Sequence, residues 1–310
     1  MNPISSEFPI HRIPAHESTT RALFEMIPEP PGELWVQGSQ KALRNLERLP
    51  ERGLGIVGTR TPRAKSLEEI SKVVRDLQGS ELVILSGFAR GVDAQAHSEA
   101  IRFQLPTVAV IASGLDIAYP SQHGPLRRSL LQSGGLIVSE LEPGTEPRPH
   151  YFLRRNRIIA AWSQALWVVE AGQRSGALNT ATWARDLHRT CFASPCAPGD
   201  PAFAGNQGLL DRHHALAVWG AHSFGASWLE VSGAGAGVDR RGKPTAKTGL
   251  GHDLVARIRS STYARGGESI PALLDWAMAR GSEPREFFEL LESALEQGDC
   301  REERGILLSF

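Results

Sequence analysis

The chain has 310 residues and no formal net charge, and 41% of its residues are hydrophobic while 22% are charged. This length and composition are typical of a globular protein with one sizeable α/β domain and a small additional module. The zero net charge excludes an overall electrostatic attraction of the protein to nucleic acid or membrane. Three cysteines without metal-ligand spacing, no apolar run near 18 residues and no signal-peptide core predict a cytoplasmic protein without a membrane segment.

The first 50 residues are rich in proline and glutamate, and they predict an N-terminal arm with a short strand at 34–36. The run GLGIVG at 53–58 then matches the dinucleotide pattern G-x-G-x-x-G in its letters. In that fingerprint the glycines follow the strand, whereas here Ile56 and Val57 form the strand and only Gly58 ends it. We therefore predict a strand and a basic turn through Arg60 rather than an NAD site.

The segment 82–103 predicts a buried strand, a glycine-rich turn and a helix. The strand ends at Ser86, and Gly87 and Gly91 allow a tight turn that a ligand can approach closely. The helix start offers unpaired N–H groups and a positive dipole, which suit a phosphate. The alternative is that the glycines only allow the backbone to turn between the strand and the helix, and that no ligand binds there.

Strands and helices alternate through the next hundred residues. We expect strands at 107–111, 136–139, 165–169, 190–193 and 215–218, and helices at 66–77, 124–132, 152–163 and 175–188. This order predicts an α/β fold with a doubly wound, mostly parallel sheet. Ligands of such sheets bind at the carboxyl ends of the strands, so the residues that follow each strand should meet at one rim.

The densest positive patch of the chain lies at 148–157. Four arginines alternate there with the aromatic and imidazole rings of His150, Tyr151 and Phe152. Aromatic rings beside guanidinium groups suit a single strand of nucleic acid, because its bases stack while its phosphates pair with cations. The loop 170–179 adds a second helix start at Ser175 that can receive an anion. The alternative is a solvated arginine face, or salt bridges to neighbouring residues.

Six motifs occur in a fixed order: VGTR at 57–60, SGFARGVDAQAH at 86–97, GLDIAYP at 114–120, SE at 139–140, FLRRNRIIAA at 152–161 and VVEAGQRSGALNTATWA at 168–184. Together they resemble the DNA processing protein A family, DprA/Smf, over most of 34–220. The resemblance implies an extended Rossmann-like domain that binds single-stranded DNA and forms a homodimer. It also implies a role in loading RecA recombinase during natural transformation.

The resemblance and the predicted rim together give a set of DNA-binding residues. They are Gly58, Arg60, Ser86, Gly87, Arg90, Gly91, Phe152, Arg155, Asn156, Arg157, Ser175, Gly176 and Thr180. Asp93 and His97 also match the family, and we interpret the first as a helix-start carboxylate and the second as a packed, hydrogen-bonded histidine. The predicted mechanism is binding without chemistry, with no catalytic residue, metal or cofactor.

Two regions depart from the family pattern or extend beyond it. Cys196 with His213 or His214 suggests a nucleophile or a metal site, but the absence of ligand spacing favours an incidental grouping.

The chain is predicted to divide into an arm at 1–50, a Rossmann-like DNA-binding domain at 51–231, a flexible linker at 232–251 and a winged-helix-like module at 252–310. This module consists of a hairpin-like tail and three helices, near 254–259, 270–280 and 284–297. The third helix is rich in glutamate and would repel phosphates, which favours a protein contact or a structural role over DNA reading.

A second hypothesis belongs to a different class of protein. A nucleotide-processing enzyme of the phosphoribohydrolase type, or a nucleotide sensor, can be built on the same sheet. Such enzymes carry a PGG-x-GT-x-x-E loop with a catalytic glutamate, whereas the equivalent turn here, EAGQRSGALNTA, has no glutamate after its glycine. A scaffold that acts through its dimer and its tail is a third possibility.

Overall fold

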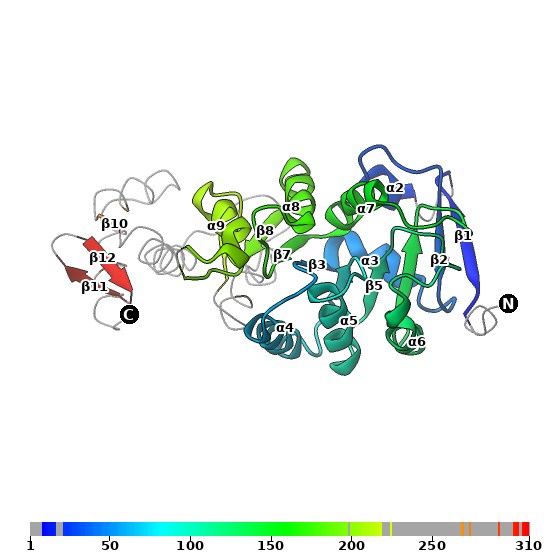
Figure 1. Cartoon of the computed structure of the whole chain (residues 1–310), viewed down its shortest axis with the longest axis horizontal. Coiled ribbons are helices and arrows are strands. Elements are labelled where there is room, and N and C mark those ends of the chain that lie inside the picture. Colours follow the sequence, from blue (N-terminus) through cyan, green and yellow to red (C-terminus); the bar gives the residue numbers. More distant parts are fainter. Residues whose placement is uncertain are drawn as a thin grey trace, which may run out of the picture. The chain divides into compact units, whose positions relative to one another are not determined.

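The computed structural model describes residues 8–16, 21–197 and 199–218, with residues 224, 273 and 291 and the segments 268–269, 300–303 and 306–309. The chain forms two compact units, residues 1–236 and 237–310. Figure 1 shows their helices and strands.

The first unit is built on a nine-stranded sheet with the order β1-β2-β6-β5-β4-β3-β7-β8-β9 (Figure 1). Strands β3 to β9 are parallel to one another, whereas β2 is antiparallel to both of its neighbours, β1 and β6. The strands are β1 (Ile10–Pro14), β2 (Glu33–Gln37), β3 (Gly53–Val57), β4 (Val83–Ser86), β5 (Thr107–Val110), β6 (Leu136–Ser139), β7 (Ala165–Val168), β8 (Thr190–Ala193) and β9 (Leu216–Ala217). The predicted doubly wound, mostly parallel sheet is confirmed.

Helices cover both faces of this sheet, with α4, α5 and α6 on one side and α2, α7 and α8 on the other (Figure 1). Side chains of a strand alternate between faces, so Val83 and Leu85 join the core beneath α7 and α8 while Ile84 joins the core beneath α4 and α5. The helices are α2 (Arg21–Glu25), α3 (Arg44–Arg52), α4 (Ala64–Asp76), α5 (Val92–Arg102), α6 (Gly124–Gln132), α7 (Pro149–Trp162), α8 (Gly176–Asp186) and α9 (Ala204–Asp211).

The predicted N-terminal arm contributes to the same sheet. Strand β1 pairs with β2, and β2 pairs with β6 through Val36 and Val138. The side chains of Leu34 and Val36 are buried. The short strand at 34–36 is therefore confirmed as part of β2, but the segment does not lie apart from the sheet. The five residues of β2 do not reveal that the strand pairs with β6, one hundred residues further along the chain. The division of the chain into four parts stays a prediction.

The first two glycines of the run 53–58 lie inside β3. A Cβ at Gly53 would lie 2.8 Å from the backbone oxygen of Leu49, and one at Gly55 would lie 2.7 Å from a methyl group of Leu166. These glycines therefore allow close packing within the sheet and against its neighbours. This position fits the prediction that the run is not a phosphate-binding loop.

The second unit contains a three-stranded antiparallel sheet of β10 (Glu268–Ser269), β11 (Cys300–Glu303) and β12 (Ile306–Ser309), in the order β10-β12-β11. The predicted hairpin-like tail is confirmed by the pairing of β11 with β12. The linker at 232–251 and the three predicted helices lie outside the described residues, apart from the buried side chains of Leu273 and Leu291. The winged-helix interpretation of this module stays a prediction.

Candidate nucleic-acid interface

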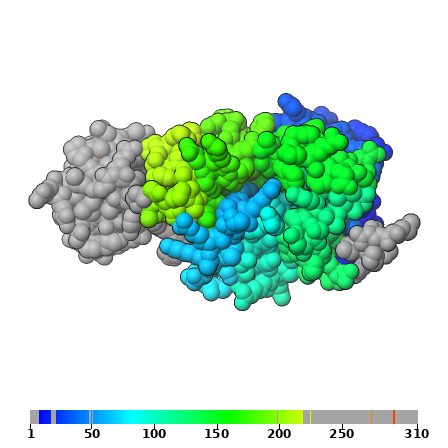
Figure 2. Space-filling model, in the orientation of Figure 1, coloured from blue at the N-terminus to red at the C-terminus, as the bar shows by residue number. Residues whose placement is uncertain are grey.

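The order of the strands reverses between β3 and β7, because β4, β5 and β6 continue to one side and β8 and β9 to the other. Sheets of this kind bind ligands at the carboxyl ends of the strands at such a reversal. A cavity of about 820 Å³ lies there, and a smaller one of about 270 Å³ lies beside it. In Figure 2 the light-blue segment that follows β3 meets the green surface of α7 and α8 on this side of the unit.

The large cavity brings together the residues that follow β3 and those that begin α7 and α8. Eight residues of the predicted DNA-binding set line it: Gly58, Arg60, Phe152, Arg155, Asn156, Ser175, Gly176 and Thr180. Gly87 and Arg90 line the small cavity, which shares Arg60 and Phe152 with the large one. Ser86, Gly91 and Arg157 line neither cavity.

Arg60 and two aromatic rings form the boundary between the cavities. The guanidinium carbon of the exposed Arg60 lies 5.4 Å from the centre of the Phe152 ring, and the Tyr119 ring lies 5.6 Å from Phe152. No ion pair joins Arg60 to another residue in the described part of the chain. Its charge is therefore free to meet a phosphate while the rings offer faces to bases.

The start of α8 is an open helix N-terminus on the large cavity. Ser175 is the N-cap, and its Oγ accepts a hydrogen bond from Ala177 N at 3.3 Å. Gly176 is exposed, and a Cβ there would meet nothing within 4 Å. The exposed Arg174 lies beside it and also lines the cavity. Ala177 N and Leu178 N are hydrogen-bonded to Ser175, so the groups that face an anion here are the exposed Gly176, the helix dipole and the Arg174 cation.

The glycine turn before α5 satisfies its own polar groups. The buried Ser86 donates its hydroxyl proton to Ile56 O at 2.6 Å. Ala89 N donates to the Asp93 carboxylate at 3.2 Å, and Val92 N donates to Thr59 O at 3.2 Å. These donors are engaged within the protein. The structure thus differs from the prediction that this helix start receives a phosphate, and it favours the geometric role of the turn.

Arg155 supports the floor of the large cavity rather than its surface. Its side chain is 5% exposed, and it donates hydrogen bonds to Gly87 O at 2.7 Å and to Val110 O. A Cβ at Gly87 would lie 2.7 Å from the guanidinium carbon, so a larger residue there would displace the Arg155 side chain. Burial lowers the pKa of Arg155 to about 10, and it raises the pKa of Asp93, whose charge Arg155 partly offsets. Arg155 therefore stays protonated at neutral pH.

Arg157 is placed elsewhere than we predicted. Its guanidinium is 2% exposed and donates to both carboxylate oxygens of Glu140, at 2.9 and 2.8 Å. It also donates to Pro28 O at 2.9 Å and to Glu29 O at 3.0 Å. The salt-bridge alternative therefore describes Arg157, which joins α7 to the N-terminal segment and does not face either cavity. Asn156 likewise joins helices, because its amide donates to Gly176 O and to Asn179.

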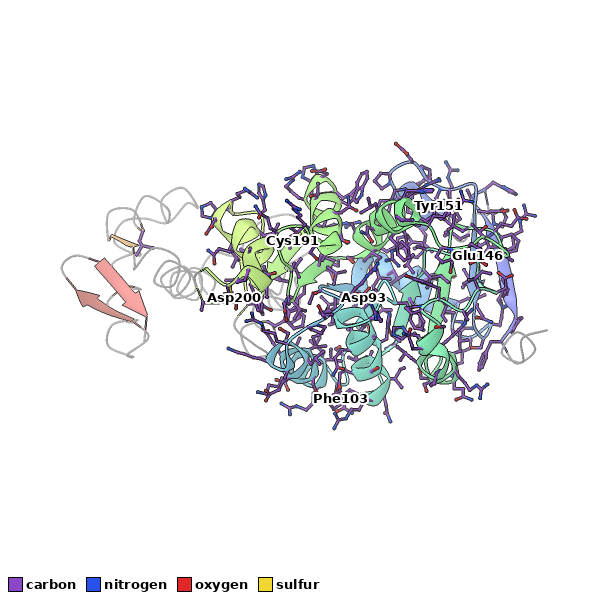
Figure 3. All side chains as sticks on the ribbon, in the orientation of Figure 1. Asp93, Phe103, Glu146, Tyr151, Cys191 and Asp200 are labelled. Carbon is purple, nitrogen blue, oxygen red and sulfur yellow. The ribbon has the colours of Figure 1, made fainter. Side chains whose placement is uncertain are left out.

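Asp93 and His97 have the structural roles that the sequence predicted. Asp93, labelled in Figure 3, lies in the first turn of α5 and accepts the hydrogen bond from Ala89 N. His97 is fully buried, and its Nδ1 lies 2.7 Å from Thr107 Oγ1. Because that hydroxyl donates to Ile84 O, Nδ1 of His97 carries a proton. Burial lowers the pKa of His97 to about 3, so the ring is neutral at neutral pH.

The neutral state of His97 predicts a loss of stability in acid. Burial lowers the pKa of His97 from 6.5 to about 3, so between these values the unfolded chain binds a proton that the folded chain does not. We expect this group to reduce the free energy of unfolding by about 1.4 kcal/mol per pH unit as the pH falls through that window. Urea denaturation at several pH values should give a shallower slope for His97→Asn, whereas the exposed control His150→Asn should keep the slope of the unchanged protein. Equal slopes for all three proteins would contradict the assignment.

Three further acidic or thiol groups lie near the rim, namely Glu170, Asp200 and Cys196. The buried Glu170 accepts hydrogen bonds from Arg63 N at 3.0 Å and Ser66 Oγ at 2.6 Å, so its carboxylate caps the start of α4. Asp200, labelled in Figure 3, pairs with Arg63, and burial raises the pKa of the Cys196 thiol. Within the described residues, no three His, Cys, Asp or Glu side chains are grouped to hold a metal ion.

No helix in the described part of the chain has the length and the apolar character that crossing a membrane requires.

Sequence reasoning missed two residues of the interface, Tyr119 and Leu153, which line the large cavity and are 39% and 51% exposed. Large apolar side chains at the surface are a signal for binding only once a structure shows that they are exposed.

The part of the chain that forms this rim matches a known family. The family described as DNA recombination-mediator protein A matches residues 12–228, which is more than half of the chain. The chain belongs to this family. The predicted resemblance to DprA/Smf proteins is therefore confirmed.

Relatives in the family agree with this assignment in sequence and fold. A DprA protein of Mycobacterium tuberculosis is 40% identical over 185 residues, which cover 60% of this chain and 46% of the relative. The chain thus spans about half the length of the curated relatives that match it most strongly. The structure of DprA from Streptococcus pneumoniae superposes with a TM-score of 0.63 and 30% identity, over 70% of this chain and 74% of that one.

A second solved structure concerns DNA processing protein A from Helicobacter pylori and the single-stranded DNA binding mode of that protein. It matches with a TM-score of 0.62 and 27% identity, over 73% of this chain and 98% of that one. The family likeness therefore covers the nine-stranded sheet, on which the two cavities lie.

Proposed function

We propose that this chain binds single-stranded DNA at the carboxyl rim of its sheet, as a DNA-processing protein of the recombination-mediator family. The observation that carries the proposal is the position of Arg60, whose guanidinium lies over the Phe152 ring at the edge of an 820 Å³ cavity. A phosphate can pair with this cation while a neighbouring base stacks on the rings. The open start of α8 offers a second phosphate position.

The contact set of the proposal is narrower than the set predicted from the sequence. Surface groups make the contacts, namely Arg60, Arg90, Phe152, Arg174, Ser175 and Gly176. Gly58, Gly87, Asn156 and Thr180 shape the walls and the floor, and Arg155 adds a buried positive charge below them. Ser86, Gly91 and Arg157 hold the surrounding turns and the N-terminal segment in place.

Removal of the Arg60 charge should weaken binding without unfolding the protein. We expect Arg60→Ala to lose about 1–3 kcal/mol of affinity for a labelled oligo-thymidine, and to reduce the salt dependence of binding by about one phosphate contact. Fluorescence anisotropy across a salt series measures both quantities. The exposed Arg128 on α6 lines neither cavity, so Arg128→Ala is the matched control and should bind as the unchanged protein does. If Arg60→Ala binds as tightly as the control, the proposed site is wrong.

We extend the proposal, on the family resemblance, to a homodimer that protects incoming DNA and loads RecA recombinase in the cytoplasm. Gel filtration with and without oligo-thymidine would report the oligomeric state and the DNA complex together. RecA filament formation on the bound oligonucleotide tests the loading step. If the protein is a monomer that binds DNA but does not accelerate the formation of RecA filaments, the proposed DNA binding stands and this extension is wrong.

A further inference from the structure

Arg60 lies in the segment 58–63 that leads from β3 to α4, which we call the Arg60 loop. Strand β3 pairs in parallel with β7, so the residues that follow the two strands also lie side by side. Thr59 N donates a hydrogen bond to Glu170 O at 2.7 Å. The backbone of Glu170 therefore holds the Arg60 loop directly before Arg60.

The side chain of the same glutamate holds the other end of the Arg60 loop. Arg63 is the N-cap residue of α4, but its side chain makes no capping hydrogen bond, and the first turn of α4 has no acidic residue. Glu170 supplies the missing acceptor from 107 residues away, because its Oε2 accepts hydrogen bonds from Arg63 N at 3.0 Å and Ser66 Oγ at 2.6 Å. One residue thus fixes the loop on both sides of Arg60.

Glu170 is also tied to the start of α8 without facing the proposed DNA site. It lines neither cavity, and it is 2% exposed. The chain continues from Glu170 to Ser175, the N-cap of α8 and the second proposed phosphate position. The fully buried Asn206 holds this connection, because it accepts a hydrogen bond from Ala171 N at 2.8 Å. Glu170 is therefore a fixed point that the Arg60 loop and the start of α8 share.

We propose that Glu170 is a positioning residue that fixes the Arg60 guanidinium relative to the start of α8, so that two phosphates of one strand bind at a set spacing. This inference rests on the proposed function and goes beyond it, because it assigns a role in DNA binding to a residue that does not touch the strand. A loop held at one end only would have to become ordered when DNA binds, and this ordering lowers affinity. The Glu170 carboxylate orders the loop beforehand.

Removal of the carboxylate should uncouple Arg60 from the site. We expect Glu170→Ala to weaken the binding of a labelled oligo-thymidine by about 5–100-fold, and to lower its salt dependence by up to about one phosphate contact. In this background, the additional change Arg60→Ala should weaken binding by a factor at least about 3 smaller than it does in the unchanged protein. Fluorescence anisotropy across a salt series, with each variant shown to be folded, measures these effects. Independent, additive losses would overturn the proposal.

Conservative variants of the same residue separate positioning from contact with DNA. Glu170→Gln keeps a side-chain oxygen that can accept from Arg63 N and Ser66 Oγ, so it should restore the affinity and the salt dependence of the unchanged protein. Glu170→Asp shortens the side chain, so its affinity should fall between those of the Ala and Gln variants. It provides the same test if Glu170→Ala does not fold. A Gln variant that binds as weakly as the Ala variant would contradict the positioning role.

Glu99 on α5 is a matched control for the loss of a buried carboxylate. It is 7% exposed, it accepts hydrogen bonds from Ser71 Oγ at 3.0 Å and Gln95 Nε2 at 2.9 Å, and it lines neither cavity. Because Ser71 belongs to α4, Glu99→Ala also loosens the packing of that helix, but away from the Arg60 loop. We expect lower stability in urea with unchanged affinity and salt dependence. A loss of affinity equal to that of Glu170→Ala would overturn the proposal.

The outcomes separate this inference from the proposed function. If Arg60→Ala weakens binding but Glu170→Ala binds as the unchanged protein does, only the positioning role is wrong. If Arg60→Ala binds as tightly as Arg128→Ala, the proposed site is wrong and the inference falls with it.

Discussion

Arg157→Ala should reduce the free energy of unfolding by about 3–5 kcal/mol, because it leaves the buried Glu140 carboxylate without its buried partner and with only the exposed Arg154 beside it. Both side chains are almost fully buried, at 2% and 4% exposed, and two short hydrogen bonds join them. The substitution also removes the donors to Pro28 O and Glu29 O. Urea denaturation of the full chain measures the loss.

Arg154 provides a matched control for this prediction. Its Nε lies 3.3 Å from the same carboxylate, but its side chain is 53% exposed, so Arg154→Ala should cost at most about 1 kcal/mol. The double variant Arg157→Met with Glu140→Leu removes both charges and should recover much of the lost stability. If Arg157→Ala kept its stability and lost only DNA affinity, Arg157 would be a ligand contact and the structural role would be wrong.

Gly91→Ala should lose about 2–5 kcal/mol of stability, because backbone strain and overpacking act together. Gly91 has a φ of 78°, and a Cβ there would lie 2.7 Å from the carbonyl carbon of Arg60 and close to Thr59 O. Backbone atoms cannot rotate away as the end of a side chain can. We therefore expect the turn that carries Arg60 to move and the affinity for oligo-thymidine to fall as well.

Gly124→Ala is the control for the effect of a methyl group on a glycine. Gly124 is the first residue of α6, its φ is −52°, and a Cβ there would meet nothing within 4 Å. We expect a change in unfolding free energy within about 0.5–1 kcal/mol and unchanged DNA affinity. Equal stability of the two variants, measured by urea denaturation, would contradict the clash at Gly91.

The fold was predictable where the signal is local. Apolar runs such as 136–139 and 165–168 end in polar or glycine-containing turns, and each is a strand of the sheet. The strand at 34–36 was predictable, but its place in the sheet was not, because β2 finds its partner β6 only through tertiary pairing. The edge strand β1, which pairs with β2, was not predicted. The rim followed from the alternation of strands and helices, since parallel strands end on the same side.

The arginines of α7 show where sequence reasoning ends. Arg154, Arg155 and Arg157 lie within four residues, yet the first is exposed and the other two are buried. Their partners come from distant segments, at Gly87 for Arg155 and at Glu140 for Arg157. No periodicity within the helix encodes these partners. The contact of Arg60 with the Phe152 ring also joins distant segments. The sequence placed each residue in a motif, but it did not show that the two side chains meet.

The antiparallel strands β1 and β2 have a practical consequence for any shortened version of the protein. A fragment that begins at residue 51 would leave one side of β6 without a hydrogen-bonded neighbour, which invites edge-to-edge self-association. It would also strip the Arg157 side chain of two backbone acceptors. Aggregation of such a fragment would therefore reflect an unprotected strand and would not report the oligomeric state of the full chain.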